Sequence, residues 1–281
     1  MAAGTLPARI FHLPTAAGAR LCLCHLPAAA PRGAILYLHP FAEEMNKSRR
    51  MAALQARRFA AAGFAVLQVD LAGCGDSDGD LRDVRWDTWM ADVAAAAAWL
   101  RGAAPGPLWL WGLRLGALLA LDAARRLPVP VEGCLLWQPV TDGALHLNQF
   151  LRLKLAGAAM QEDGADAAGN GVTALRARLQ QGETIEVGGY PIAPALADDL
   201  SRLRLADLAM PGPRIAWCEV VPQAARGWPP AARRVLDAWQ RRGIAASAHL
   251  VEGLPFWTTA EIAECPALLA LGDVLVERVP A

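Results

Sequence analysis

The chain of 281 residues lacks several features that would define its partners or its compartment. It has no run of about 18 apolar residues, which argues against a membrane-spanning helix. Residues 1–14 lack a basic patch followed by a long apolar stretch, so we expect no secretory signal. Basic and acidic residues number 27 each. The resulting zero net charge gives no electrostatic case for binding nucleic acid or an anionic membrane.

The cysteines do not form a metal-binding pattern. Cys22 and Cys24 make one close pair, but no second pair follows that would complete a zinc site. We therefore expect no metal and no cofactor. The cysteines are interpreted as reduced, buried side chains of a cytoplasmic protein; they are Cys22, Cys24, Cys74, Cys134, Cys218 and Cys265.

What the chain does have is apolar material arranged in alternating strand-like and helical stretches. Hydrophobic residues make up 54% of the sequence and charged residues 19%. We expect strands at residues 20–26, 34–39, 64–70, 108–111, 133–137, 214–220 and 244–251, and helices at 49–62, 86–101, 117–127, 230–242 and 259–276. Continuous apolar strands separated by helices indicate a single α/β domain over residues 1–281, with a mostly parallel sheet of about eight strands covered on both faces.

Residues 142–210 break this alternation. They contain a stretch rich in Gly, Ala and Asp at 164–171 and a helical piece with basic residues at 175–181. We interpret the segment as a lid inserted over the carboxyl ends of the strands. The alternative is a solvated surface subdomain with no gating role. Exposed apolar residues expected in this lid, Phe150, Leu151 and Leu155, would allow a protein partner to bind there.

One motif carries most of the functional information. Gly112-Leu113-Arg114-Leu115-Gly116 follows an apolar strand and opens an apolar helix. This is the setting of the G-x-S-x-G turn, in which a strained strand-to-helix bend presents a nucleophilic serine. The central residue here is Arg114. An arginine stays protonated and cannot attack a carbonyl carbon.

Four motifs resemble those of a known family. They are residues 39–47 (HPFAEEMNK), 70–77 (DLAGCGDS), 111–114 (WGLR) and 255–257 (PFW). With them the chain resembles the α/β-hydrolase superfamily and, more narrowly, the family named hydrolase 2, exosortase A system-associated. The resemblance implies an α/β-hydrolase fold and an ester, thioester or acyl substrate. It also implies a bacterial cytoplasmic protein encoded near genes for exopolysaccharide synthesis and PEP-CTERM protein sorting.

A catalytic triad of this fold follows the chain order serine, acid, histidine. The place of the histidine, residues 252–257, contains none, and His249 lies inside the expected last strand. His146 in the lid is the remaining alternative for a base. No carboxylate follows strand 214–220, so Glu219 and Asp142 are the alternatives for the acid.

No other side chain stands out as a nucleophile. The serines are Ser48, Ser77, Ser201 and Ser247. We expect Ser48 to cap a helix, with Asn46 as an alternative cap, and Ser77 to have a structural role. Cys74 would need a lowered pKa and a nearby base to react. A nucleophile–base–acid set is therefore not expected.

Polar residues should still gather at the carboxyl ends of the parallel strands. The expected set is His39, Phe41, Glu43, Glu44, Asp76, Arg114, Gln138 and Glu219, with Trp137, Trp217 and Trp257 as walls. A cation at a helix start opposes the helix dipole by about 0.3–1 kcal/mol, and burial makes an anionic partner necessary. Glu43 or Glu44 is the first choice of partner for Arg114, and Glu219 the next.

Three roles for this site remain open. Arg114 could form an internal ion pair that fills a closed pocket. It could bind a small anionic or acyl ligand, with help from the amides of Leu115 and Phe41. The ligand-binding candidates are His39, Phe41, Glu43, Glu44, Arg114, Leu115, Gln138 and Trp257. Alternatively, Glu43 or Glu44 could activate water against an ester polarised by Arg114, with Glu219 as a further catalytic candidate; His39 is expected to support its loop. A non-catalytic scaffold protein is the alternative function.

Overall fold

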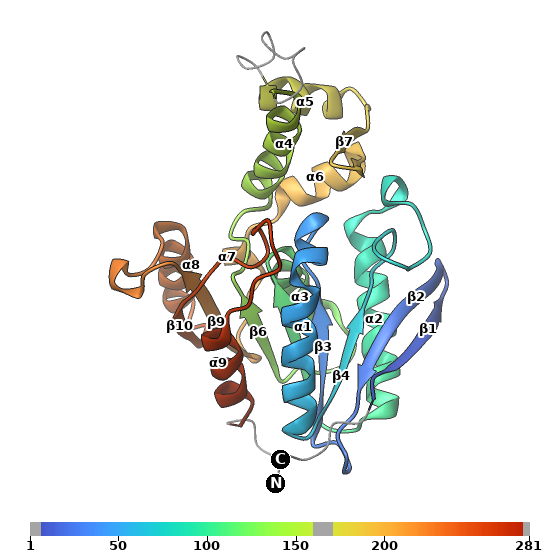
Figure 1. Ribbon diagram of the computed structural model, residues 1–281, viewed down its shortest axis with the longest axis vertical. Helices are drawn as coiled ribbons and strands as arrows, with labels where there is room; N and C mark the ends of the chain where they lie inside the picture. Colours follow the sequence, from blue (N-terminus) through green and yellow to red (C-terminus); the bar gives the residue numbers. More distant parts are fainter. Residues whose placement is uncertain (1–6, 160–170, 278–281) are drawn as a thin grey trace.

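A mixed sheet of eight strands forms the centre of the computed structural model, which describes residues 7–159 and 171–277 (Figure 1). The strand order is β1-β2-β4-β3-β5-β6-β9-β10. The strands are β1 (Arg9–Thr15), β2 (Gly18–His25), β3 (Gly33–Leu38), β4 (Phe64–Val69), β5 (Leu108–Leu113), β6 (Gly133–Trp137), β9 (Arg214–Val221) and β10 (Ala246–Glu252). β2 pairs antiparallel with β1 and β4, and all other neighbours are parallel. The predicted mostly parallel α/β fold is confirmed.

Helices cover both faces of the sheet (Figure 1). Along β3, Leu36 and Leu38 point to the core shared with α2 (Trp86–Ala103), α3 (Leu115–Arg126) and α8 (Pro230–Arg241). Ile35 and Tyr37 point to the opposite core, shared with α1 (Glu43–Ala61) and α9 (Pro266–Glu277). This two-sided burial explains why the central strands are apolar throughout rather than alternating.

Helix α1 begins earlier than the sequence suggested. The expected start near Arg49 is wrong, because the helix begins at Glu43 and Ser48 lies buried inside it rather than at its cap. Glu43 and Glu44 occupy the first turn, where the helix dipole favours negative charge. Helix α9 begins later than expected, at Pro266, a residue suited to the first position of a helix.

The segment between β6 and β9 stands beyond one end of the sheet (Figure 1). It contains α4 (Gly143–Ala159), α5 (Gly171–Gln180), the hairpin of β7 (Ile185–Val187) and β8 (Tyr190–Ile192), α6 (Pro194–Arg202) and α7 (Leu205–Leu208). Short 3₁₀ helices lie elsewhere, at η1 (Leu81–Asp83) and η2 (Ala224–Arg226). An isolated bridge between Asp142 and Arg204 joins the two ends of the segment at its base.

The apolar residues predicted to be exposed in this segment are not the exposed ones. Phe150 is 8% exposed and Leu151 is fully buried, because this side of α4 packs into the core. Leu155 is partly buried against the same core. Leu145 and Leu153, at 58% and 60% exposure, face solvent instead, as does Met210 near the end of the segment.

Within residues 7–159 and 171–277, no helix is both long and apolar enough to span a bilayer.

Candidate functional site

The turn between β5 and α3 is a sharp one, and Arg114 occupies it with φ 56° and ψ −116°. The glycines on either side allow close backbone packing. A Cβ on Gly116 would lie 2.1 Å from the Leu38 carbonyl oxygen, and one on Gly112 would lie 2.3 Å from the Gly116 carbonyl oxygen. The motif therefore needs both glycines for its geometry, as the strand–turn–helix prediction requires.

Two more non-glycine residues near this turn have a positive φ. Ala42, before α1, has φ 53°, and Gln138, after β6, has φ 43°. Both follow strands whose carboxyl ends neighbour that of β5. Such conformations are unfavourable for residues with a Cβ and concentrate at functional sites. The strained backbone thus surrounds Arg114 at the carboxyl edge of the sheet.

Arg114 has an internal anionic partner. Its Nε donates a hydrogen bond to Glu44 Oε1 at 3.2 Å, and its Nη1 donates to the Gln138 carbonyl oxygen at 3.5 Å. The guanidinium carbon lies 5.5 Å from the centroid of the Trp257 ring, within cation–π range. The Arg114 and Glu44 side chains are 16% and 17% exposed. Since a guanidinium carries five N–H donors, these contacts leave part of the fork available.

The carboxyl group of Glu44 takes up a proton more easily than a solvent-exposed glutamate does. Burial raises the pKa of its carboxyl group, and the charge and hydrogen bond of Arg114 oppose that rise only in part. Its second oxygen, Oε2, is buried and has no hydrogen-bond partner. A carboxylate oxygen in that position gains from taking up a proton or from receiving an additional donor.

His146 approaches the same place from helix α4. Its ring centroid lies 6.4 Å from that of Phe41, and the residue is 7% exposed. Neither Nδ1 nor Nε2 has a hydrogen-bond partner. Burial, followed by the nearby charge of Arg114, lowers the pKa of His146 to about 3. The ring is therefore neutral near pH 7, with no carboxylate to orient it as a base.

Glu219 is bound within the sheet edge. Its Oε1 accepts a hydrogen bond from Gln138 Nε2 at 3.0 Å, and its Oε2 accepts one from Trp217 Nε1 at 2.7 Å. Burial raises the pKa of Glu219, and these donors and the charge of Arg114 oppose that rise only in part. Gln138 Oε1 in turn accepts from the amide of Val220 at 2.6 Å. Both Glu219 and Gln138 thus fix the ends of β6 and β9 beside Arg114.

His39 supports its loop. Its Nδ1 donates to the Pro40 carbonyl oxygen at 2.7 Å, and its Nε2 accepts from the Leu71 amide at 3.2 Å. Burial lowers its pKa, and both ring nitrogens are already used. A cavity of about 10 Å³ lined by Phe41 and Leu115 lies next to it, close to the space that one water needs.

Glu43 points elsewhere than its neighbour Glu44. Its exposed carboxylate accepts hydrogen bonds from the Tyr190 hydroxyl at 3.1 Å and from Asn46 Nδ2 at 3.3 Å. Tyr190 lies on β8, so this contact joins the inserted segment to α1. No sequence pattern pointed to Tyr190, because a tyrosine in a short hairpin carries no positional signal.

The alternative nucleophiles have structural surroundings. Ser77 Oγ donates to the Asp70 carbonyl oxygen at 2.6 Å and accepts from the Leu21 amide at 2.8 Å. Burial raises the pKa of the Cys74 thiol to about 12, so it is not a thiolate. Ser201 and Ser247 donate to the carbonyl oxygens of residues 197 and 215.

The remaining carboxylates and His249 lie in structural surroundings of their own. Asp142 forms an ion pair with Arg204 at 3.1 Å and accepts a hydrogen bond from the Leu145 amide. His249 lies within β10, as expected. The amide of Asp76 donates to Asp70, in the loop after β4. Across the described residues, no three His, Cys, Asp or Glu side chains are arranged to hold a metal ion.

Comparisons with known proteins were made for the sequence and for the fold. A family model described as serine aminopeptidase, S33, matches residues 29–170. No curated protein matches the sequence.

Solved α/β-hydrolase structures match nearly the whole chain. A thermostable carboxyl esterase from Bacillus coagulans, crystallised with glycerol, is 13% identical with a TM-score of 0.65, covering 97% of this chain and 98% of its own. A serine hydrolase without a lid from Xanthomonas campestris is 17% identical with a TM-score of 0.61, covering 99% of both chains. The α/β hydrolase GrgF from a Penicillium species is 19% identical with a TM-score of 0.62, covering 97% of this chain and 99% of its own. At these identities the likeness concerns the fold.

Proposed function

The chain belongs to the α/β-hydrolase family whose model is described as serine aminopeptidase, S33, and from that premise we propose that it binds a small anionic acyl compound at Arg114 without serine-based catalysis. The position between β5 and α3 is where this fold carries its nucleophile, and Arg114 replaces the serine there. The hydroxyls of Ser77, Ser201 and Ser247 donate to backbone carbonyl oxygens, and the pKa of the Cys74 thiol is raised to about 12.

The observation that carries the proposal is a set of buried polar atoms without partners around Arg114. These are Glu44 Oε2 and both ring nitrogens of His146. Leaving such an atom unsatisfied costs about 1–3 kcal/mol. The protein side chains around Arg114 therefore offer both donors and acceptors that a polar group can satisfy.

A carboxylate ligand fits this chemistry. The unused N–H groups of Arg114 can bind it in a bidentate manner. Because burial already raises the pKa of Glu44, that carboxyl group takes up a proton when a second anion arrives, and its hydroxyl then donates to the ligand. Arg114 remains balanced by one negative charge, so binding is coupled to uptake of a proton.

Buried aromatic side chains adjoin the site. The Phe41 ring lies 5.0 Å from that of Phe150 on α4 and 6.1 Å from that of Trp89. Phe41 and Leu115 line the small cavity beside them, and their amides correspond in chain position to the oxyanion-binding amides of the fold. An ester, thioester or acyl origin for the ligand is what the motif resemblance implies. A role beside exopolysaccharide synthesis and exosortase A protein sorting rests on the motif resemblance alone and belongs to this proposal, as does a lid role for residues 142–210.

A second candidate function is supported by one feature of α4. Leu145 and Leu153 are eight residues apart and both face solvent. Two exposed leucines on one helix suit a non-catalytic protein that binds a partner through the inserted segment. In that case the Arg114–Glu44 pair only closes the old site.

The test is a melting-temperature series with butanoate, butyl phosphate and the neutral analogue butanamide. We expect the anions to stabilise the wild-type protein, by about 2.7 kcal/mol at a hundredfold excess over Kd. The variant Arg114→Met should lose the effect. Arg58→Met, which removes a surface ion pair with Asp273, should keep it. Equal shifts with butanamide, or shifts that persist in Arg114→Met, would contradict the proposal, and no shift with any of the three compounds would favour the partner-binding alternative.

A further inference from the structure

A large apolar pocket lies at the opposite edge of the sheet from Arg114. Its volume is about 590 Å³, within the range of small-molecule sites. Ile35, Phe64 and Trp109 line it from the amino-terminal halves of β3, β4 and β5, and Arg214 lines it from the first residue of β9. Arg114, by contrast, follows the last residue of β5. The two sites are therefore separated by the length of the strands.

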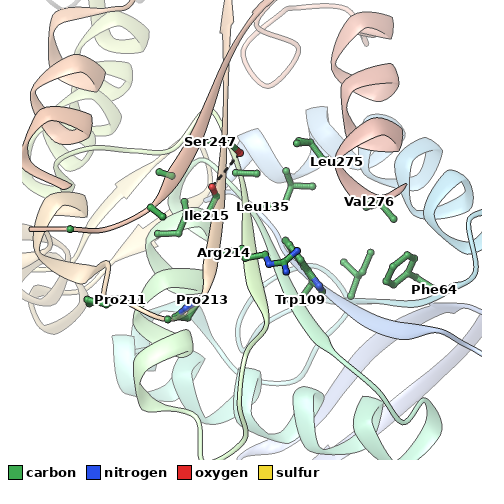
Figure 2. Close-up of a pocket in the computed structure, with 16 residues that line it drawn as sticks. Phe64, Trp109, Leu135, Pro211, Pro213, Arg214, Ile215, Ser247, Leu275 and Val276 are labelled. Atoms are coloured by element: carbon green, nitrogen blue, oxygen red, sulfur yellow. Dashed lines mark hydrogen bonds between the residues drawn. The ribbon is translucent and has the colours of Figure 1, made fainter. Parts of the chain in front are cut away.

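The lining is apolar on most sides. Figure 2 shows Phe64, Leu275 and Val276 on one side of the space, Pro211 and Pro213 on the other, and Trp109 and Arg214 between them. The backbone also makes room for the indole. A Cβ on Gly133 would lie 2.5 Å from the Trp109 ring, so only glycine permits that ring position.

The unpaired or weakly paired side-chain groups of this pocket are hydrogen-bond donors. Trp109 Nε1 is buried and has no acceptor. Arg214 pairs only loosely with Glu132, at 3.5 Å, and its side chain is 55% exposed, so this ion pair contributes little. The Ser247 hydroxyl makes one long hydrogen bond, 3.4 Å, to the Ile215 carbonyl oxygen. An indole N–H and a guanidinium can donate but cannot accept.

We propose that this pocket binds a long-chain monocarboxylic acid, with its carboxylate at Arg214 and Trp109 Nε1 and its alkyl chain along the apolar walls. The headgroup must accept hydrogen bonds and carry negative charge, because both partners are donors and one is a cation. The tail must be apolar, because Ile35, Phe64 and Val276 present only hydrocarbon. This site is independent of the function proposed for Arg114.

The experiment is calorimetric titration of the full-length protein with decanoate, decanol and acetate. We expect decanoate to bind about tenfold or more tightly than decanol, a difference of about 1.4 kcal/mol, and acetate not to bind measurably. Arg214→Met should abolish the preference for decanoate over decanol. Ser247→Phe, which places a large ring at an exposed position of the pocket lining, should weaken both ligands.

Two matched variants locate the ligand. Arg226→Met removes an exposed arginine that is not part of the pocket lining and should bind decanoate like the wild type. Arg114→Met should also retain decanoate binding. Equal affinities for decanoate and decanol, no binding of either, or unchanged decanoate binding in Arg214→Met would overturn the proposal. Loss of decanoate binding in Arg114→Met alone would overturn it too, and would place the acid at the site between β5 and α3.

Discussion

Removing the cation between β5 and α3 should destabilise the protein in a pH-dependent way. Arg114→Met leaves Glu44 in a buried position, 17% exposed, without its partner. Breaking a buried ion pair by removing one side costs about 3–5 kcal/mol, and the residual exposure of both side chains places this pair near 3 kcal/mol. For a chain of this size such a loss lowers the melting temperature by roughly 6 °C.

The sign of the pH dependence follows from Glu44. Its folded pKa lies above the unfolded value of about 4.3, so its contribution to stability is present below that value and is lost as pH rises through the folded pKa. Arg114 is the main group that opposes this rise, and removing it raises the folded pKa further. The loss caused by Arg114→Met should therefore be larger at about pH 8 than at about pH 5.

The assay is urea unfolding at both pH values, with two comparison variants. The double variant Arg114→Met/Glu44→Gln removes the unpaired carboxylate of Glu44 and should regain part of the stability lost in Arg114→Met. Arg58→Met breaks an exposed ion pair and should change the free energy of unfolding by less than about 1 kcal/mol. The reasoning fails if Arg114→Met is as stable as the wild type, if its loss is the same at both pH values, or if the double variant recovers nothing.

Three further outcomes are expected. Gly116→Ala should destabilise the fold by more than about 3 kcal/mol in urea unfolding, because its Cβ would meet backbone oxygens that cannot move aside; Gly102→Ala, in helix α2 with open space around it, is the control for steric effects. His146→Leu should stabilise the protein by about 1 kcal/mol or more, since it removes two unsatisfied buried nitrogens. Because the folded pKa of His146 is about 3, the contribution of His146 to stability is present above about pH 6.5 and is lost as pH falls toward 3. His146→Leu should therefore lose less stability than the wild type over this pH range. Equal loss of melting temperature in acid for the two proteins would contradict this. Cys74 should react slowly with iodoacetamide near pH 7, since burial raises its pKa to about 12; rapid alkylation mapped to it by mass spectrometry would contradict this.

Much of the architecture could be predicted from the alternation of apolar strands and helices. The order of strands and helices along the chain predicts where the carboxyl ends of the strands lie. The sharp turn at Arg114 is predicted by Gly112 and Gly116, and the structure has no room for a Cβ at either position. Strand β1 was missed because its residues are largely exposed and only Leu13 is buried, so the apolar signal is weak.

The partners within the site were harder to predict. Glu43 and Glu44 are adjacent in sequence and looked equivalent, yet the helical rotation between neighbours directs one to Tyr190 and the other to Arg114. The sequence also could not predict which side of α4 faces the core, because its leucines are distributed around the helix. Packing against the rest of the protein buries Leu151 and leaves Leu153 exposed.

The most direct test of the proposal that the serine nucleophile has been lost is intact-mass analysis after treatment with a fluorophosphonate, which labels activated serines. We predict no mass increase on the wild-type protein, and none on Arg114→Ser either, since the nearby imidazole of His146 has no carboxylate partner to orient it as a base. An adduct on the wild-type protein, mapped to any of Ser48, Ser77, Ser201 or Ser247, would contradict it.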